Sequence, residues 1–281
     1  MFTSNPFAEL SSWLSPSIMQ GYITLMILLV VAGTIFDVLH KKSARYFSEN
    51  MRKQKANAKR SVGGGEMVSS AIRTAVVDVA ASGEFCNPKR RIAHLLTMYG
   101  FIAFALATAV MIYAYPAAAD TPAIWPQLWH VGALMVCVGG YWFWFFIRVD
   151  VAAEGNSPFR VVHADLFVLS LLGSATFALL WSWLQSADSS WTKVAFGLFA
   201  AATTVLFAGV PWSKFAHMFF KPAAAFQKRV TKADGSLENL PEVPDLADPA
   251  VHERYPDIPE YLGKNPPDMG LGIKREAPNH Y

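Results

Sequence analysis

The sequence predicts an all-α integral membrane protein with five transmembrane helices, an N-terminus outside the cell and a long cytoplasmic C-terminal tail. Hydrophobic residues make up 53% of the 281 residues and charged residues only 16%, whereas soluble domains carry about 25% charged residues. Five apolar runs are each long enough to cross a hydrocarbon core of about 30 Å. The positive charges lie between and after these runs, in the pattern that sets membrane orientation.

The predicted elements follow one another in a simple order. Residues 1–16 form an N-terminal segment that lacks the basic start of a cleavable signal peptide. The first span is 17–40, and the basic segment 41–93 follows, with the spacing of an amphipathic helix over 66–81. A four-helix core over 94–220 then contains spans at 94–115, 128–147, 163–184 and 194–220, and Pro211 is expected to bend the last of them.

The distribution of basic residues predicts the orientation of the chain. All but one of the 24 lysines and arginines lie in residues 40–91, 148–162 and 213–281. Five spans place these three segments on one side of the membrane, which the positive-inside rule makes cytoplasmic. We therefore expect a multi-pass protein of a bacterial inner membrane, with lipid around it and no nucleic acid among its partners.

The tail over 221–281 is acidic and rich in proline, and it has too few aliphatic residues to build a core. It is either a disordered, solvating tail or an extended arm that docks a cytoplasmic partner. Apolar residues spaced among the prolines favour the arm: Leu240, Val243, Leu246, Tyr255, Ile258, Tyr261 and Leu262.

A basic segment runs into an apolar one at CNPKRRIAHLLTMYGF, with His94 at the boundary and Arg90 and Arg91 one helical turn before it. An imidazole at this depth could ligate a b-type haem, and the two arginines could pair with its propionates. The same residues also suit a plain positive-inside anchor with an interfacial histidine. The two cysteines cannot hold an iron–sulfur cluster, which needs four ligands.

A bis-histidine haem needs a second imidazole at the same depth on a facing helix. His217 meets this requirement, and Lys214 lies one turn before it, although these residues also suit a positive-inside cap. His163 is a competing ligand. His40 is followed by two lysines and suits a cap. The predicted haem site therefore comprises His94, His217, Arg90, Arg91 and Lys214.

The stretches FC–NPKRR–xxH–xxxMYGF, HADLFVLSLLGSATFAL and SKFAHMFFKP resemble the membrane cytochromes b of respiratory redox complexes. That group includes the nitrate reductase gamma subunit and the membrane subunits of heterodisulfide reductase and of the quinone-interacting membrane-bound oxidoreductase. The resemblance covers roughly residues 80–230. A free-standing anchor with an acidic, proline-rich tail looks most like the membrane anchors of dissimilatory adenylylsulfate reductase. The resemblance implies sulfur metabolism and a cytoplasmic flavin and iron–sulfur partner.

The sequence departs from the two-haem pattern of the nitrate reductase type. In that type, a second histidine follows the first by ten residues on one helix and precedes it by eighteen on the other. The corresponding positions here are Phe104 and Phe199, and phenylalanine cannot ligate iron. We expect a single haem, with aromatic packing in place of the outer one.

Three functions compete. The first is electron transfer between a cytoplasmic enzyme and membrane quinone through one haem b, and the second is a haem-free anchor that docks the enzyme and frames the quinone site. The third is a transporter, which the absence of charged residues at mid-depth and of an internal repeat disfavours.

With one haem, the quinone should react on the cytoplasmic side, where His163 and Asp165 could hold and protonate it. Asp165 also suits a helix N-terminus as a favourable charge. His130, at the outer face, is the alternative quinone contact.

Overall fold

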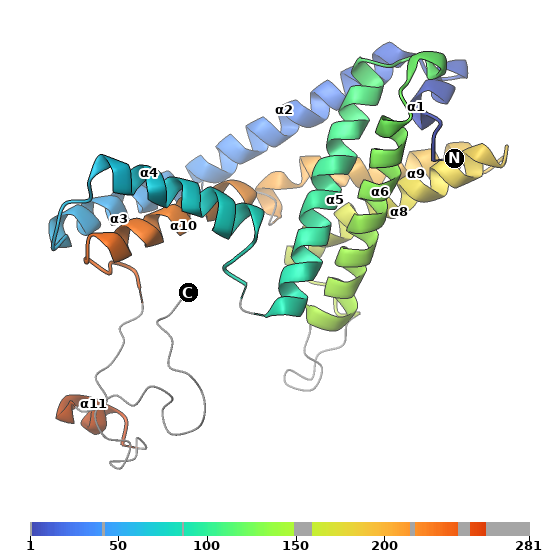
Figure 1. Ribbon diagram of the computed structural model, residues 1–281. Helices are drawn as coiled ribbons and strands as arrows, with labels where there is room; N and C mark the ends of the chain where they lie inside the picture. Colours follow the sequence, from blue (N-terminus) through green and yellow to red (C-terminus); the bar gives the residue numbers. More distant parts are fainter. Residues whose placement is uncertain are drawn as a thin grey trace. The chain divides into compact units, whose positions relative to one another are not determined.

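The structure is a computed structural model that describes residues 2–40, 43–85, 87–148, 159–213, 217–240 and 248–256. These residues form helices and turns, with no strand among them (Figure 1). Four helices are long and apolar enough to cross a membrane: α2 (Pro16–His40), α5 (Pro88–Tyr113), α6 (Ile124–Trp142) with its π-helical continuation η4 (Phe143–Ile147), and α8 (Leu166–Ser186). The predictions of an all-helical class and of a multi-pass membrane protein are confirmed.

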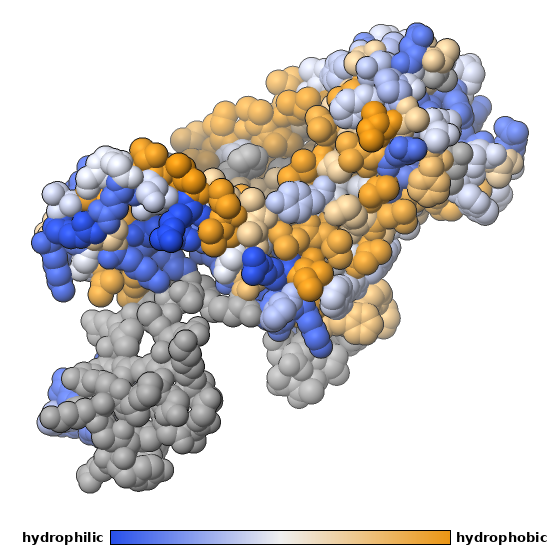
Figure 2. Space-filling model, viewed as in Figure 1, coloured by the Kyte–Doolittle hydropathy of each residue, from blue (hydrophilic) through white to orange (hydrophobic). Residues whose placement is uncertain are grey.

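The fifth apolar helix, α9 (Thr192–Ala208), has 17 residues and is shorter than the other four, so the count of five spans stays a prediction. Figure 2 shows hydrophobic side chains over α2 and along α5, whereas hydrophilic ones gather over α3. The helix expected over 66–81 is confirmed as α4 with the π-helix η2. The other elements are α1 (Pro6–Glu9), η1 (Leu10–Ser12), α3 (Ser43–Asn57), α4 (Gly64–Arg73), η2 (Thr74–Ala80), η3 (Ala118–Asp120), η5 (His163–Asp165), η6 (Val210–Trp212), α10 (His217–Ala233) and α11 (Pro249–Arg254).

The chain divides into two compact units. The first comprises residues 1–47 and 73–224, and the second is built from the described residues of 48–72 and 225 onward. The first unit contains α2 together with α5, α6, α8 and α9. Within this unit, α2 packs on α9 and on η6.

The second apolar helix begins earlier than the sequence analysis expected. α5 starts at Pro88 and not at His94, because the Asn87 side chain accepts hydrogen bonds from the backbone N–H groups of Lys89 (2.9 Å) and Arg90 (3.3 Å). Asparagine followed by proline at the first helical position is a strong helix start. As a result, the basic residues and His94 share the first two turns of one helix.

The last predicted span, 194–220, is not one bent helix. α9 ends at Ala208, Val210–Trp212 form a 3₁₀ turn, and Ser213 is extended. Pro211 has no N–H to continue the α-helical hydrogen bonds, and it disfavours helical geometry in the residue before it. The chain therefore breaks at this point, and His217 begins a separate helix, α10.

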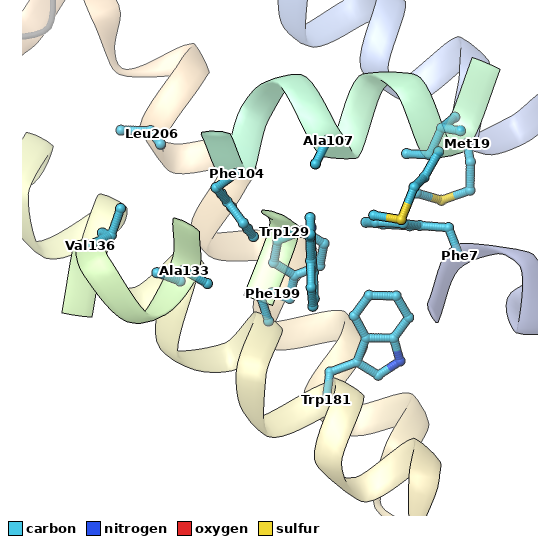
Figure 3. Packing of buried hydrophobic residues seen from close by; sticks show 14 of the residues in the cluster. Phe7, Met19, Phe104, Ala107, Trp129, Ala133, Val136, Trp181, Phe199 and Leu206 are labelled. Carbon is cyan, nitrogen blue, oxygen red and sulfur yellow. The ribbon is translucent and has the colours of Figure 1, made fainter. Parts of the chain in front are cut away.

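The core of the first unit is aromatic (Figure 3). Trp181 and Phe199 stack with ring centroids 5.7 Å apart. Phe104 packs on Trp129 at 5.3 Å and lies edge-on to Phe199 at 6.3 Å. Phe7, from the short helix α1, closes one end of this cluster by contacting Trp181 at 5.2 Å.

Residues of α1 are tied to loops far along the chain. The Asn5 side chain donates to the carbonyl oxygen of Tyr115 (2.9 Å) and to Thr121 Oγ1 (3.1 Å). The Gln185 amide donates to the carbonyl oxygen of Pro6 (3.1 Å). The N-terminal segment thus forms a plug at the end of the bundle where α5 and α8 terminate.

Helices α5 and α6 pack backbone to backbone through glycines. A Cβ atom added to Gly132 would lie 2.7 Å from the Phe104 nitrogen and 2.8 Å from the Gly100 oxygen. A Cβ atom on Gly139 would lie 2.6 Å from the carbonyl oxygen of Ala93. Close approach at small residues is the usual way in which membrane helices associate, since lipid provides no hydrophobic force between them.

The second unit joins the segment after α2 to the segment after α9. Gln54 on α3 donates to the Asp234 carboxylate (2.7 Å), and the backbone N–H of Lys59 donates to the Asp234 carbonyl oxygen (2.9 Å). Asn57 donates to Glu238 (3.0 Å). Residues 221–233 of the predicted extended tail are helical and belong to α10. Most of the remaining tail lies outside the described residues.

Candidate functional site

His94 lies on the second turn of α5, half-buried against the turn that ends η2. Its Nδ1 is 3.0 Å from Ser82 Oγ, and its ring centroid is 4.8 Å from that of Phe85. Ser82 is buried and adopts a left-handed conformation (φ 49°), which non-glycine residues rarely take. The following Gly83 is needed there, since a Cβ atom would lie 2.8 Å from the Val77 oxygen. This tight turn fixes the orientation of the His94 imidazole.

The two arginines before His94 differ in their surroundings. Arg91 Nε donates to the carbonyl oxygen of Ala81 (2.7 Å), which ties α5 to the same turn. Arg90 is exposed on the first turn of the helix. The structure thus brings Arg91 and His94 to one turn, at Ala81 and Ser82.

The other half of the predicted haem site is described only in part. His217 is the first residue of α10, and its side chain lies outside the described residues. Lys214 also lies outside them. The pairing of His94 with His217 therefore remains a prediction.

The surroundings of His94 fit one axial ligand of a haem. A ligating histidine usually holds its other ring nitrogen in a hydrogen bond that fixes the tautomer, and the Ser82 hydroxyl is placed to do this for Nδ1. In that tautomer, Nε2 is the nitrogen that would bind iron. Among the described residues, no three His, Cys, Asp or Glu side chains form a metal-ion cluster, but a haem needs only axial ligands.

Phe104 and Phe199 occupy the positions where the two-haem pattern has histidines. Both are buried, and they pack against each other and against tryptophan rings (Figure 3). The expected aromatic packing at these two positions is confirmed.

Asp165 is held in an ion pair at the start of α8. Its carboxylate accepts hydrogen bonds from Arg148 Nε (2.9 Å) and from the backbone N–H of Val162 (2.9 Å), and it forms a salt bridge with an Arg148 terminal nitrogen. Arg148 also lies over the Trp144 ring, 4.1 Å from its centroid. These contacts favour the interpretation of Asp165 as a helix-end charge. His163, two residues earlier, is exposed.

His130 is fully buried between α6 and α8. Its Nδ1 donates to the carbonyl oxygen of Pro126 (2.7 Å), and its Nε2 lies 2.8 Å from Ser182 Oγ. The Phe2 ring covers it at a centroid distance of 4.9 Å. Because both ring nitrogens have protein partners, His130 joins two helices. His40, in contrast, is exposed and stacks on Phe36 at 5.3 Å.

An apolar cavity of about 350 Å³, which the sequence does not predict, lies between α2, α5, α8 and α9. His94, His130, His163 and Asp165 are all absent from its lining. The only sequence signal is a pair of small residues, Ala105 and Ala109, which leave space on one face of α5. The lining also includes Tyr22, Met26, Val30, Val31, Phe101, Leu171, Ser174, Thr203, Leu206, Phe207 and Met218.

Comparison of the chain with protein-family models, with curated proteins and with solved structures gives no match.

Proposed function

We propose that this chain is a membrane anchor and electron-transfer subunit that links a cytoplasmic redox enzyme to the quinone pool through a single haem b. The resemblance of its sequence points to adenylylsulfate reductase as the enzyme, with flavin and iron–sulfur subunits. In this proposal α9 is the fifth span, and the basic segments face the cytoplasm of a bacterial cell.

The observation that carries the proposal is the contact between Ser82 and His94. A buried hydroxyl 3.0 Å from Nδ1, in a turn with an uncommon backbone conformation, orients the imidazole. His217 is the proposed second ligand, because it follows the break after α9 at the start of a new helix.

The proposed roles follow from the chemistry of each side chain. Ser82 holds the His94 tautomer, while Arg90, Arg91 and Lys214 neutralise the two propionates. When bound, the haem supplies one-electron redox chemistry. The tail after Leu240 is proposed to dock the cytoplasmic enzyme.

The test is the haem content of the purified chain, measured as the pyridine haemochrome per polypeptide. The wild type should carry about one haem, and His94→Ala should carry none. His40→Ala is the matched control, since His40 is an exposed histidine at a helix end and should keep the haem. Ser82→Ala should retain haem with a shifted midpoint potential, because Nδ1 loses its partner. Full haem retention in His94→Ala would refute the assignment.

The second candidate is a haem-free anchor that frames the quinone site. The observation that favours it is the large apolar cavity, whose lining includes no histidine among the side chains that the structure describes. In that case the partner's clusters would reduce quinone directly. The absorption spectrum of the reduced, purified protein separates the two functions, because only the first gives a haem b spectrum.

A further inference from the structure

The apolar cavity is elongated along the helices that enclose it. On α2 its lining runs from Met19 to Val31, which corresponds to about 18 Å of helix. On α5 it runs from Phe101 to Ala109, which is about 12 Å. A space of about 350 Å³ with this form suits a chain-like ligand better than a planar one.

Every polar group described in the wall is already paired within the protein. Ser174 Oγ and Thr203 Oγ1 are 2.7 Å apart, and Thr108 Oγ1 donates to the Phe104 carbonyl oxygen (2.7 Å). The Tyr22 hydroxyl donates to the carbonyl oxygen of Ala200 (3.0 Å). Water needs two to four polar partners to fill a cavity, and this wall does not offer them. The wall therefore suits a hydrocarbon ligand and not water.

The wall that α2 gives to the cavity is partly exposed. The two helices are joined at one end, where Gln20 donates to the Ile112 carbonyl oxygen (3.2 Å), and they diverge beyond it (Figure 1). Farther along α2, Gly33 packs on Val210. Between these contacts, Ile27 and Val31 line the cavity and remain 53% and 50% exposed. A chain could therefore enter sideways from the bilayer.

We propose that this cavity holds the isoprenoid tail of a membrane quinone. The proposal rests on the proposed function, and it locates the tail of that quinone. Met218 lines the cavity and directly follows His217. A tail bound here would bring its polar head out beside the proposed haem ligand, where electrons must be exchanged. A phospholipid chain has the same hydrocarbon chemistry but brings no electron acceptor to this end.

The test compares two added phenylalanines in the full-length protein. Ala105→Phe places a ring in the cavity, whereas Ala201→Phe places one on α9 at an exposed position outside the lining. Each protein is titrated with a long-tailed ubiquinone and with its analogue that has a single isoprene unit, and tryptophan fluorescence reports binding. Quinone and phospholipid that co-purify are extracted and quantified, and the haem spectrum is recorded separately.

The long-tailed ubiquinone should bind the wild type and Ala201→Phe equally and bind Ala105→Phe on the order of tenfold more weakly. The short analogue should bind weakly to all three proteins. Ala109→Leu, a milder change of the same wall, covers the case in which Ala105→Phe does not fold. Equal binding by the cavity variants, or a co-purified phospholipid that ubiquinone does not displace, would overturn the proposal. An absent haem spectrum would instead overturn the electron-transfer function and leave the binding result interpretable.

Discussion

Replacement of Gly132 by alanine should destabilise the membrane bundle, although alanine is the better helix former. The new Cβ atom would meet the Phe104 nitrogen at 2.7 Å, the Gly100 oxygen at 2.8 Å and the Phe104 Cα atom at 3.1 Å. All three are backbone atoms of α5, so no side-chain rotation can relieve the contact. α5 and α6 must separate by several tenths of an ångström.

The magnitude follows from two opposing effects. Alanine in place of glycine favours a helix by about 1 kcal/mol, while overpacking a tight contact costs about 1–3 kcal/mol. Separation of the helices also weakens the contact at Gly139, so the overpacking cost should lie toward the upper end of its range. We expect a net loss of about 1–2 kcal/mol in the free energy of unfolding.

The assay is unfolding of the purified protein in mixed micelles with increasing sodium dodecyl sulfate, followed by far-UV circular dichroism. Gly197→Ala is the control, because nothing lies within 4 Å of a Cβ atom at that position on α9. The control should keep or raise the midpoint, and Gly132→Ala should lower it. The reasoning fails if both variants unfold at the same detergent fraction.

Three further outcomes are expected from other parts of the chain. Asp165→Asn should lower the free energy of unfolding by about 1–3 kcal/mol, since it leaves Arg148 without its carboxylate partner; the same detergent titration measures this loss. Burial raises the pKa of Asp234, but hydrogen bonds from Gln54 and the Ser236 backbone outweigh it and hold that pKa below its ordinary value. The stabilisation is therefore present above the ordinary aspartate pKa and is lost as the pH falls through the folded-state pKa. The protection factors of α3 amides, which are corrected for the intrinsic exchange rate at each pH, should therefore fall in acid in the wild type and not in Asp234→Asn. A chain truncated after Leu240 should insert and keep α10 but fail to co-purify with the cytoplasmic enzyme, and undiminished co-purification would exclude the tail as the docking arm.

The sequence predicted the apolar spans well because a bilayer demands long apolar helices whatever their tertiary packing. The start of α5 was misplaced because the asparagine–proline cap at Asn87 outweighs the polarity of the basic residues that follow it. α10 was missed for a different reason. Its second half is polar. The hydrogen bond at its C-terminal end joins Asp234, the residue after the helix, to Gln54, which lies far away in the sequence.

The candidate site was predictable only at the level of residue types. A basic pair before an apolar run indicates the membrane boundary, and a histidine there indicates a possible ligand. The partner of that histidine, Ser82, could not be found from spacing, because the left-handed turn that positions it depends on the end of a π-helix. The cavity depends on the angle between α2 and α5, which no local pattern encodes.

The plug formed by residues 5–7 has a consequence for the biogenesis of the protein. These residues leave the ribosome long before their partners, which include Tyr115, Thr121 and Gln185. Contacts across such long stretches of sequence form late, after the intervening helices have been inserted. The end of the bundle therefore stays open during synthesis. It closes only when α8 has entered the membrane and the C-terminal end of α8 can contact residues 5–7.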